Sequence, residues 1–269
     1  MRAQEQLITT DGAETASPPL VDPMAGAGYA PGLASSIARP SYALSTALLP
    51  TRVELPELLN RRGLLGRGAE VGVKLGFFSD HLLSQWRGQQ LISIDPWLHD
   101  DPDSYVDTGN VQQGEQETYY RTTLDLLAKY GERSSVWRMT SLEAAERIAD
   151  NELDFVYIDA RHDYHSVRED LETWLPKVRP GGILAGHDYL DGEFPEGRFG
   201  VKSAVDEVFG RYGLTVHSTF QDTPWISWVV ALPDGVRRRA PRPVERTLRS
   251  TLIAARSARR SLQRGDHGE

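Results

Sequence analysis

Acidic residues and histidines that can bind a metal or move a proton follow two apolar segments of the chain. Asp159 ends LDFVYID, and the pair His187–Asp188 closes GGILAGHDY. If these segments are neighbouring parallel strands, one hard cation can reach both aspartates, and such oxygen ligands suit Mg²⁺ or Mn²⁺. We therefore expect a divalent metal site at Asp159, His187 and Asp188. Alternatively, each aspartate only caps the following helix, and His187 contacts substrate or packs.

His162 stands three residues after Asp159, where the next helix should begin. An imidazole with its ordinary pKa near ~6.5 can remove a proton at neutral pH. His162 is thus the candidate general base, although an ordinary residue at a helix start is the other interpretation. His165, one turn further along, is expected on the helix surface.

An earlier turn has the residue types of a nucleoside-binding site. The segment EVGVKLG places Glu70 before Gly72 and Gly76, and Asp95 ends the next apolar segment. Glycines let a ligand approach the backbone, Glu70 can bind an amino group, and Asp95 can accept from both ribose hydroxyls. The glycines alone are also typical of a plain tight turn. A dinucleotide-binding G-x-G-x-x-G motif is not met, because Glu70 and Leu75 occupy two of its glycine positions.

Further residues are placed to contact the nucleoside. Trp97 could flank the adenine, and Thr140 and Ser141, at the end of the following strand, stand near its expected edge. In open α/β sheets ligands bind beyond the carboxyl ends of the strands, so all these positions fall on one rim.

From residue 51 onward, apolar segments alternate with helical ones. Such alternation predicts right-handed βαβ units and a parallel sheet. Strands are expected within 69–75, 91–97, 135–141, 153–159 and 181–189, and helices at 55–65, 78–86 (with Ser79 as its cap), 117–130, 166–178 and 201–212. Segments 216–220 and 225–233 lie too close for a crossover helix and predict an antiparallel hairpin. The fold class is α/β: a Rossmann-like, doubly wound, mostly parallel seven-stranded sheet with an antiparallel C-terminal hairpin.

The stretch from Arg67 to Tyr189 resembles class I S-adenosylmethionine-dependent methyltransferases, with Lys74 where their donor turn commonly has its middle glycine. VYIDARHDYHSVREDLETWLPKVRPGGILAGHDY is similar to the corresponding part of bacterial metal-dependent sugar O-methyltransferases, of macrolide-sugar and mycobacterial methylmannose-polysaccharide types. This resemblance implies S-adenosylmethionine as methyl donor, a metal at Asp159 and Asp188, and His162 as base. The resembling enzymes usually have an acid where this chain has His187.

Composition and charge set the wider expectations. The chain has 269 residues, no cysteine and a net charge of −8, and ten arginines with a single acid lie between Arg237 and Arg264. The remaining body is therefore acidic, which argues against a general nucleic-acid surface. We expect a flexible arm over 1–49, a methyltransferase domain over 50–235 and a basic tail over 236–269. No segment reaches the length of a membrane span and the chain has no cysteine, so a cytoplasmic enzyme is expected. A homo-oligomer is expected because proteins of the resembling fold often dimerise through added helices.

The expected function is methylation of a hydroxyl on a sugar or glycoside, assisted by a divalent metal. Two loops, 99–117 and 190–202, are expected to close the site, and Tyr105, Phe194 and Phe199 in them can stack on a sugar face or anchor the loops. The alternatives are a metal-independent methyltransferase of a phenolic or amine natural product and a non-catalytic cofactor-binding scaffold.

Overall fold

The computed structural model describes residues 49–101, 105–195 and 197–234. The expected basic tail and all but the last residue of the expected N-terminal arm lie outside these ranges. Within them, no helix combines the length and apolar character that a bilayer crossing demands.

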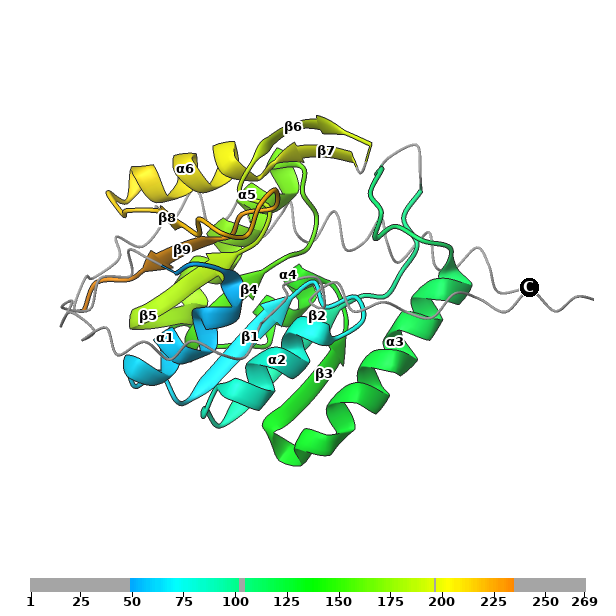
Figure 1. Ribbon diagram of the computed structural model, residues 1–269, viewed down its shortest axis with the longest axis horizontal. Coiled ribbons are helices and arrows are strands. Elements are labelled where there is room, and N and C mark those ends of the chain that lie inside the picture. The colour runs from blue at the N-terminus through cyan, green and yellow to red at the C-terminus, as the bar shows by residue number, and fades with distance from the viewer. Residues whose placement is uncertain (1–48, 102–104, 196, 235–269) are drawn as a thin grey trace, which may run out of the picture. The chain divides into compact units, whose positions relative to one another are not determined.

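A seven-stranded sheet organises the described residues (Figure 1). Its spatial order is β3-β2-β1-β4-β5-β9-β8. The first five strands in sequence pair in parallel, whereas β9 pairs antiparallel with both β5 and β8. The bounds are β1 Arg67–Val71, β2 Gln90–Asp95, β3 Ser134–Arg138, β4 Leu153–Ile158, β5 Val178–Gly186, β8 His217–Ser218 and β9 Trp228–Ala231. The predicted sheet and its antiparallel terminal hairpin are confirmed.

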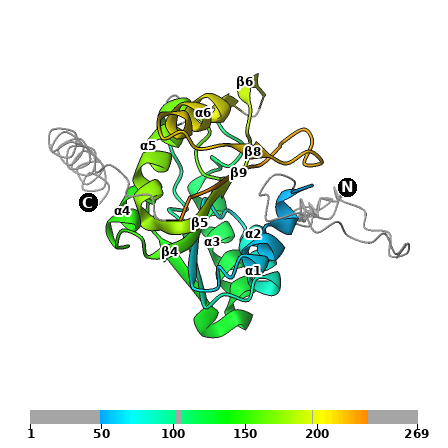
Figure 2. The same cartoon turned by 90° about the vertical axis from the view of Figure 1, so that its left-hand side faces the viewer.

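Helices cover both faces of the sheet (Figure 2). On one face lie α1 Leu55–Arg61, α2 Phe77–Gln85 and α3 Gln113–Leu127, and on the other α4 Ser141–Glu146, α5 Tyr164–Trp174 and α6 Val201–Arg211. Short 3₁₀ helices occupy Arg52–Glu54, Ala128–Arg133 and Leu175–Lys177. This two-sided cover requires strands that are apolar throughout, and β4 is buried at all six of its residues.

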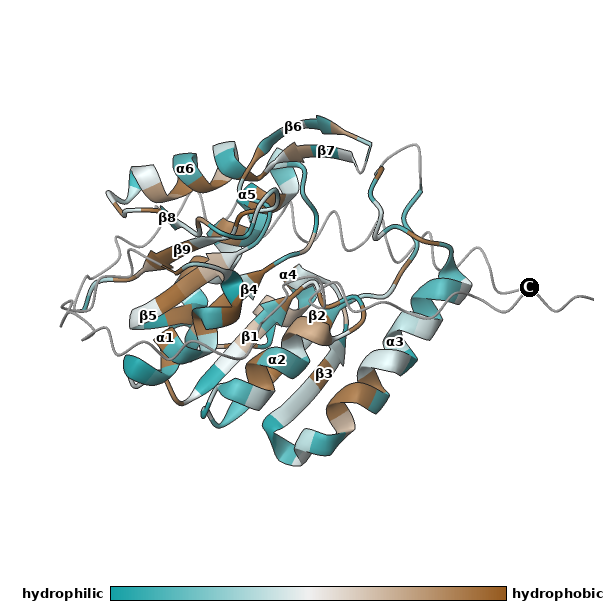
Figure 3. Ribbon diagram, viewed as in Figure 1, coloured by the Kyte–Doolittle hydropathy of each residue, from teal (hydrophilic) through white to brown (hydrophobic). Residues whose placement is uncertain are grey.

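Alternate residues of each strand supply two hydrophobic layers, one on each face of the sheet. Val156 and Leu184 join Val167, Leu171 and Val205 of helices α5 and α6 in one core. Figure 3 shows the apolar colour concentrated on strands such as β5 and β9, with polar residues on the outer sides of the helices. The opposite layer contains Trp86, whose ring meets Phe155 edge-on with centroids 4.9 Å apart. These layers hold the carboxyl ends of the strands at one fixed rim.

Two local predictions are wrong. Helix α2 begins at Phe77 after Gly76, which has φ 81°, and Ser79 lies inside the helix. Its buried hydroxyl donates to the Glu70 carboxylate instead of capping the helix. The segment 190–202, expected as a loop, contains an antiparallel hairpin of β6 Asp191–Phe194 and β7 Gly197–Gly200. Its four-residue strands are rich in glycine and polar residues, so they lack the alternating apolar pattern that predicts a strand.

Candidate active site

The two expected aspartates lie side by side because the strands before them are neighbours. Ile158 of β4 pairs with Gly186 of β5, and the His187 amide donates to the Ile158 carbonyl at 3.1 Å. Asp159 directly follows Ile158, and Asp188 lies two residues after Gly186. Asp188 has φ 51°, in the left-handed region that non-glycine residues rarely adopt. Such strain persists where surrounding contacts determine it, and it is common at functional sites.

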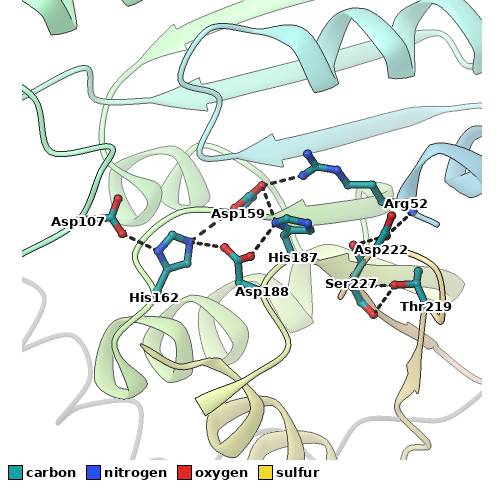
Figure 4. Close-up of polar contacts among 9 residues, drawn as sticks. All are labelled: Arg52, Asp107, Asp159, His162, His187, Asp188, Thr219, Asp222 and Ser227. Atoms are coloured by element: carbon teal, nitrogen blue, oxygen red, sulfur yellow. Dashed lines mark hydrogen bonds and ion pairs between the residues drawn. The ribbon is translucent and has the colours of Figure 1, made fainter. Parts of the chain in front are cut away.

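His162 points between the two aspartates (Figure 4). Its Nε2 lies 2.9 Å from Asp188 Oδ2 and 3.6 Å from Asp159 Oδ1. Among the described residues, this Nε2 has no hydrogen bond of regular geometry, although it is buried. The nitrogen is therefore directed at the space that the carboxylates border. The structure brings these three predicted residues together.

Asp107, which the sequence analysis did not single out, contacts the second ring nitrogen of His162, Nδ1. Its Oδ2 lies 2.7 Å from His162 Nδ1, and its Oδ1 accepts from the Gly109 amide at 2.6 Å. With the proton on Nδ1 donated to Asp107, Nε2 carries the lone pair. The sequence offers only the D-T-G turn at 107–109 as a sign that Asp107 is special. Its partner is 55 residues away, so no local spacing connects the two.

The β6–β7 hairpin fixes the ring plane of His162. Phe199 of β7 stacks on the imidazole with centroids 4.6 Å apart and planes 12° apart. The Gly200 amide donates to the His162 carbonyl at 2.9 Å, and an isolated bridge joins Asp107 to Gly197. Phe199 is buried, and Tyr105 lies under the Arg161 guanidinium at 4.0 Å. These two aromatics anchor the loops, whereas Phe194 is 39% exposed.

The electrostatics of the cluster favour charged forms. Burial lowers the pKa of His162, but three carboxylates, Asp107 first among them, outweigh burial and hold that pKa well above its usual value. Burial raises the pKa of Asp188, yet the close contacts with His162 and His187, each at 2.9 Å, bring it well below normal. The negative charge around the imidazole thus favours its protonated form.

The donor atoms available at this rim fit a divalent cation. Asp159, His162 and Asp188 each offer one ligand atom, and these atoms lie within 4.8 Å of one another. Two carboxylates and one imidazole suit Mn²⁺ or a similar ion better than Mg²⁺, which prefers oxygen. His187 lies beside this group, with Nδ1 2.9 Å from Asp188 Oδ1 and 3.8 Å from Asp159 Oδ2 (Figure 4). The role of His187 as a metal ligand stays a prediction.

The first strand-to-helix turn packs directly against Asp159. Gly72 has φ 87°, and a Cβ there would lie 1.9 Å from the Asp159 carbonyl oxygen. Gly76 also has positive φ. Lys74, where the methyltransferases that this turn resembles commonly have a glycine, has φ 54°. The backbone therefore keeps a left-handed conformation there although the glycine is replaced.

Asp95 holds this turn in place. One carboxylate oxygen accepts from the Val73 and Lys74 amides at 2.9 and 3.0 Å, and the other from the Trp97 amide at 2.8 Å. A carboxylate offers about four lone-pair sites, so three are already used. Acceptance of two ribose hydroxyls by Asp95 therefore requires some of these amides to move.

The remaining predicted nucleoside contacts have structural partners. The Trp97 indole is fully buried and donates to the Lys74 carbonyl at 2.8 Å. Thr140 caps α4 through a reciprocal capping box with Glu143. Ser141 donates to Asp170 at 2.5 Å and accepts from the Trp174 indole at 2.8 Å. Their contact with adenine stays a prediction.

Glu70 is buried beneath the turn, and desolvation raises its pKa from 4.5 to about 8, against the opposing hydrogen bond from Ser79. Between these two pH values the folded state keeps a proton that the unfolded state releases. The free energy of unfolding must therefore fall as pH rises through this window. We expect the free energy of unfolding of Glu70→Gln, relative to that of wild type, to increase from pH 5 to pH 8. The increase should be at most about 1.4 kcal/mol per pH unit.

Urea unfolding at pH 5, 6.5 and 8 measures this difference. Glu57→Gln, on the exposed side of α1, is the matched control and should parallel wild type. Equal pH slopes for Glu70→Gln and wild type would show that Glu70 is ionised in the folded protein.

This architecture is similar to that of known methyltransferases. Residues 69–189, a little under half of the chain, match the family model for a methyltransferase domain. An O-methyltransferase family protein from Burkholderia thailandensis has the same fold, with a TM-score of 0.50, 14% identity, and cover of 68% of this chain and 56% of that one. The chain thus has the class I S-adenosylmethionine-dependent methyltransferase fold, and the domain match supports a methyltransferase.

Two further proteins are similar to this chain. An O-methyltransferase from Bacillus cereus in complex with S-adenosylhomocysteine aligns at a TM-score of 0.47 and 16% identity, over 68% of this chain and 80% of that one. An uncharacterized protein of Sinorhizobium fredii, y4gI, is 27% identical over 152 residues, which is 56% of this chain. The match spans only 15% of the length of that relative.

Proposed function

We propose that this protein is an S-adenosylmethionine-dependent O-methyltransferase in which His162 deprotonates the acceptor hydroxyl. The observation that carries the proposal is the geometry of His162. Asp107 accepts at Nδ1, so the lone pair of Nε2 faces the rim where the fold binds its methyl donor. When bound, the cofactor supplies an electrophilic methyl group on a sulfonium.

The protein residues then have separate tasks. Methyl transfer is an in-line displacement, so the acceptor oxygen must be aligned and relieved of its proton. Phe199 and Asp107 fix the plane and the tautomer of His162, whose Nε2 takes the proton. The negative charge of Asp159 and Asp188 favours acceptors that donate hydrogen bonds through hydroxyl groups.

We further propose that a divalent cation assists, held by the carboxylates of Asp159 and Asp188, while His162 Nε2 stays uncoordinated and takes the proton. Such an ion lowers the pKa of an acceptor hydroxyl and offsets the carboxylate charge that otherwise keeps His162 protonated. The polyol acceptor that best suits these features is a sugar or glycoside with two adjacent hydroxyls. The exposed ring of Phe194, near Phe199 with centroids 5.5 Å apart, is available to stack on its apolar face.

Calorimetric titration with S-adenosylhomocysteine tests the donor. Turnover of a panel of mannosides and other glycosides, with EDTA or with added Mg²⁺ or Mn²⁺, then tests the metal and the acceptor. We expect cofactor binding, turnover lost in EDTA, and recovery with Mn²⁺. Turnover indifferent to EDTA would remove the metal and favour a metal-independent methyltransferase of phenols or amines. A protein that binds no S-adenosylhomocysteine contradicts the proposal.

Asp107→Asn tests the positioning of the base. Because one carboxylate partner of the imidazole is lost, we expect kcat to fall about 10- to 100-fold, with unchanged affinity for S-adenosylhomocysteine. The acidic limb of the pH–rate profile should also move to lower pH, since Asp107 raises the pKa of His162. Asp100→Asn, in the same loop but paired with Arg161, is the control. A variant with wild-type kcat and pH profile would show that Asp107 does not act on the base.

A further inference from the structure

Arg52 brings a largely buried positive charge to the rim from outside the matched domain segment. It belongs to the short 3₁₀ helix that precedes α1, and its side chain is 18% exposed. Figure 4 shows it reaching Asp159 from the side opposite His162. The Nη1–Oδ2 distance is 3.3 Å, longer than the roughly 2.7–2.9 Å of a strong charge-assisted hydrogen bond.

Arg52 also borders the donor turn. Its guanidinium lies over the Phe78 ring at 5.2 Å, and Phe78 is the second residue of α2, immediately beyond the turn. The positive charge is close enough to Glu70 to lower the pKa of that acid. A cation and a buried acid thus flank the same end of the turn.

The position of Arg52 is fixed by contacts at both ends of its segment. Its amide donates to Asp222 at 2.6 Å, and the Phe220 and Gln221 amides donate to the Pro50 carbonyl. On the other side, His81 Nε2 of α2 lies 2.8 Å from the Val53 carbonyl. These contacts fix the backbone from which the guanidinium extends, so less conformational entropy is lost when the side chain binds a ligand.

We propose that Arg52 binds the α-carboxylate of the methionyl part of the methyl donor. This assignment rests on the proposed function, which requires that zwitterionic cofactor. The cofactor ammonium lies beside Glu70, whose carboxyl oxygen can accept a hydrogen bond from it, and the carboxylate pairs with the guanidinium, whose planar fork suits a carboxylate. Arg52 then makes the site bind donors that carry the amino-acid carboxylate more tightly than donors that lack it.

The test compares S-adenosylhomocysteine with S-adenosyl-3-thiopropylamine, which lacks only the carboxylate, by calorimetric titration. Wild type should prefer S-adenosylhomocysteine about 10- to 100-fold, the size of a charged hydrogen-bond interaction. Arg52→Gln should bind the two ligands within about threefold of each other, and Arg52→Lys should keep an intermediate preference. Arg61→Gln, on the exposed side of α1, is the matched control and should behave as wild type.

The outcomes separate the assignment from the proposed function. If Arg52→Gln weakens both ligands equally or keeps the wild-type preference, Arg52 is a structural partner of Asp159 and the assignment is wrong. Equal binding of both ligands by wild type overturns it even if Arg52→Gln fails to fold. If wild type binds neither ligand, the proposed function fails, and the assignment with it.

Discussion

Replacement of His162 by alanine is expected to lower the rate of methyl transfer about 10²- to 10⁴-fold, the usual contribution of a positioned general base. The imidazole contacts Asp107, Asp159 and Asp188 but belongs to none of the turns assigned to the donor. Affinity for S-adenosylhomocysteine should therefore stay within a few-fold of wild type. Single-turnover rates at saturating acceptor, together with calorimetry, measure both quantities.

His165→Ala provides the matched control because it removes an exposed imidazole one helical turn away. Its rate should equal that of wild type. Retention of most activity by His162→Ala would contradict a base at this position. The catalytic role would then have to pass to another group at the rim.

The second large effect is expected at Gly72. A Cβ at this position would lie 1.9 Å from the Asp159 carbonyl oxygen and 2.7 Å from the Ala160 Cα, at φ 87°. Backbone atoms cannot yield as a flexible side chain can, so β1 and β4 must separate. We expect Gly72→Ala to reduce the free energy of unfolding by about 3–5 kcal/mol, measured by urea denaturation, and to displace Asp159.

Gly63→Ala separates conformational strain from the clash. Gly63 also has positive φ, 67°, but a Cβ there meets nothing within 4 Å. This control should cost only about 1–2 kcal/mol, the penalty of a left-handed non-glycine residue. Equal losses for the two variants would mean that the strands yield to the added methyl group.

The sheet could be predicted because its strands are buried on both faces. The apolar run of β4 and the helices between strands carry that information locally, and the short spacing before β9 indicated the antiparallel hairpin. The β6–β7 hairpin could not be predicted in this way, since its stability comes from contacts with distant residues such as His162 and Asp107. Ser79 was misplaced for a similar reason: a buried carboxylate competes for its hydroxyl.

At the candidate site, sequence spacing placed Asp159, His162 and Asp188 on one rim, because strand ends and the first turn of a helix have predictable positions. Asp107 and Arg52 were not predicted. Each reaches the rim from a loop or short 3₁₀ helix more than 50 residues from its partner. The Thr51–Glu54 capping box could have predicted the turn around Arg52, but not the carboxylate that it meets.

The bond between the Arg52 amide and Asp222 joins positions 170 residues apart. Bringing such distant residues together lowers the conformational entropy of the chain before the contact between them contributes any stabilisation. Such pairings therefore tend to form after local ones. The β1–β5 core can therefore assemble while this corner of the rim is still open. During synthesis, the Arg52 amide can bond to Asp222 only after the loop between β8 and β9 has emerged, so this part of the rim gains its last support late.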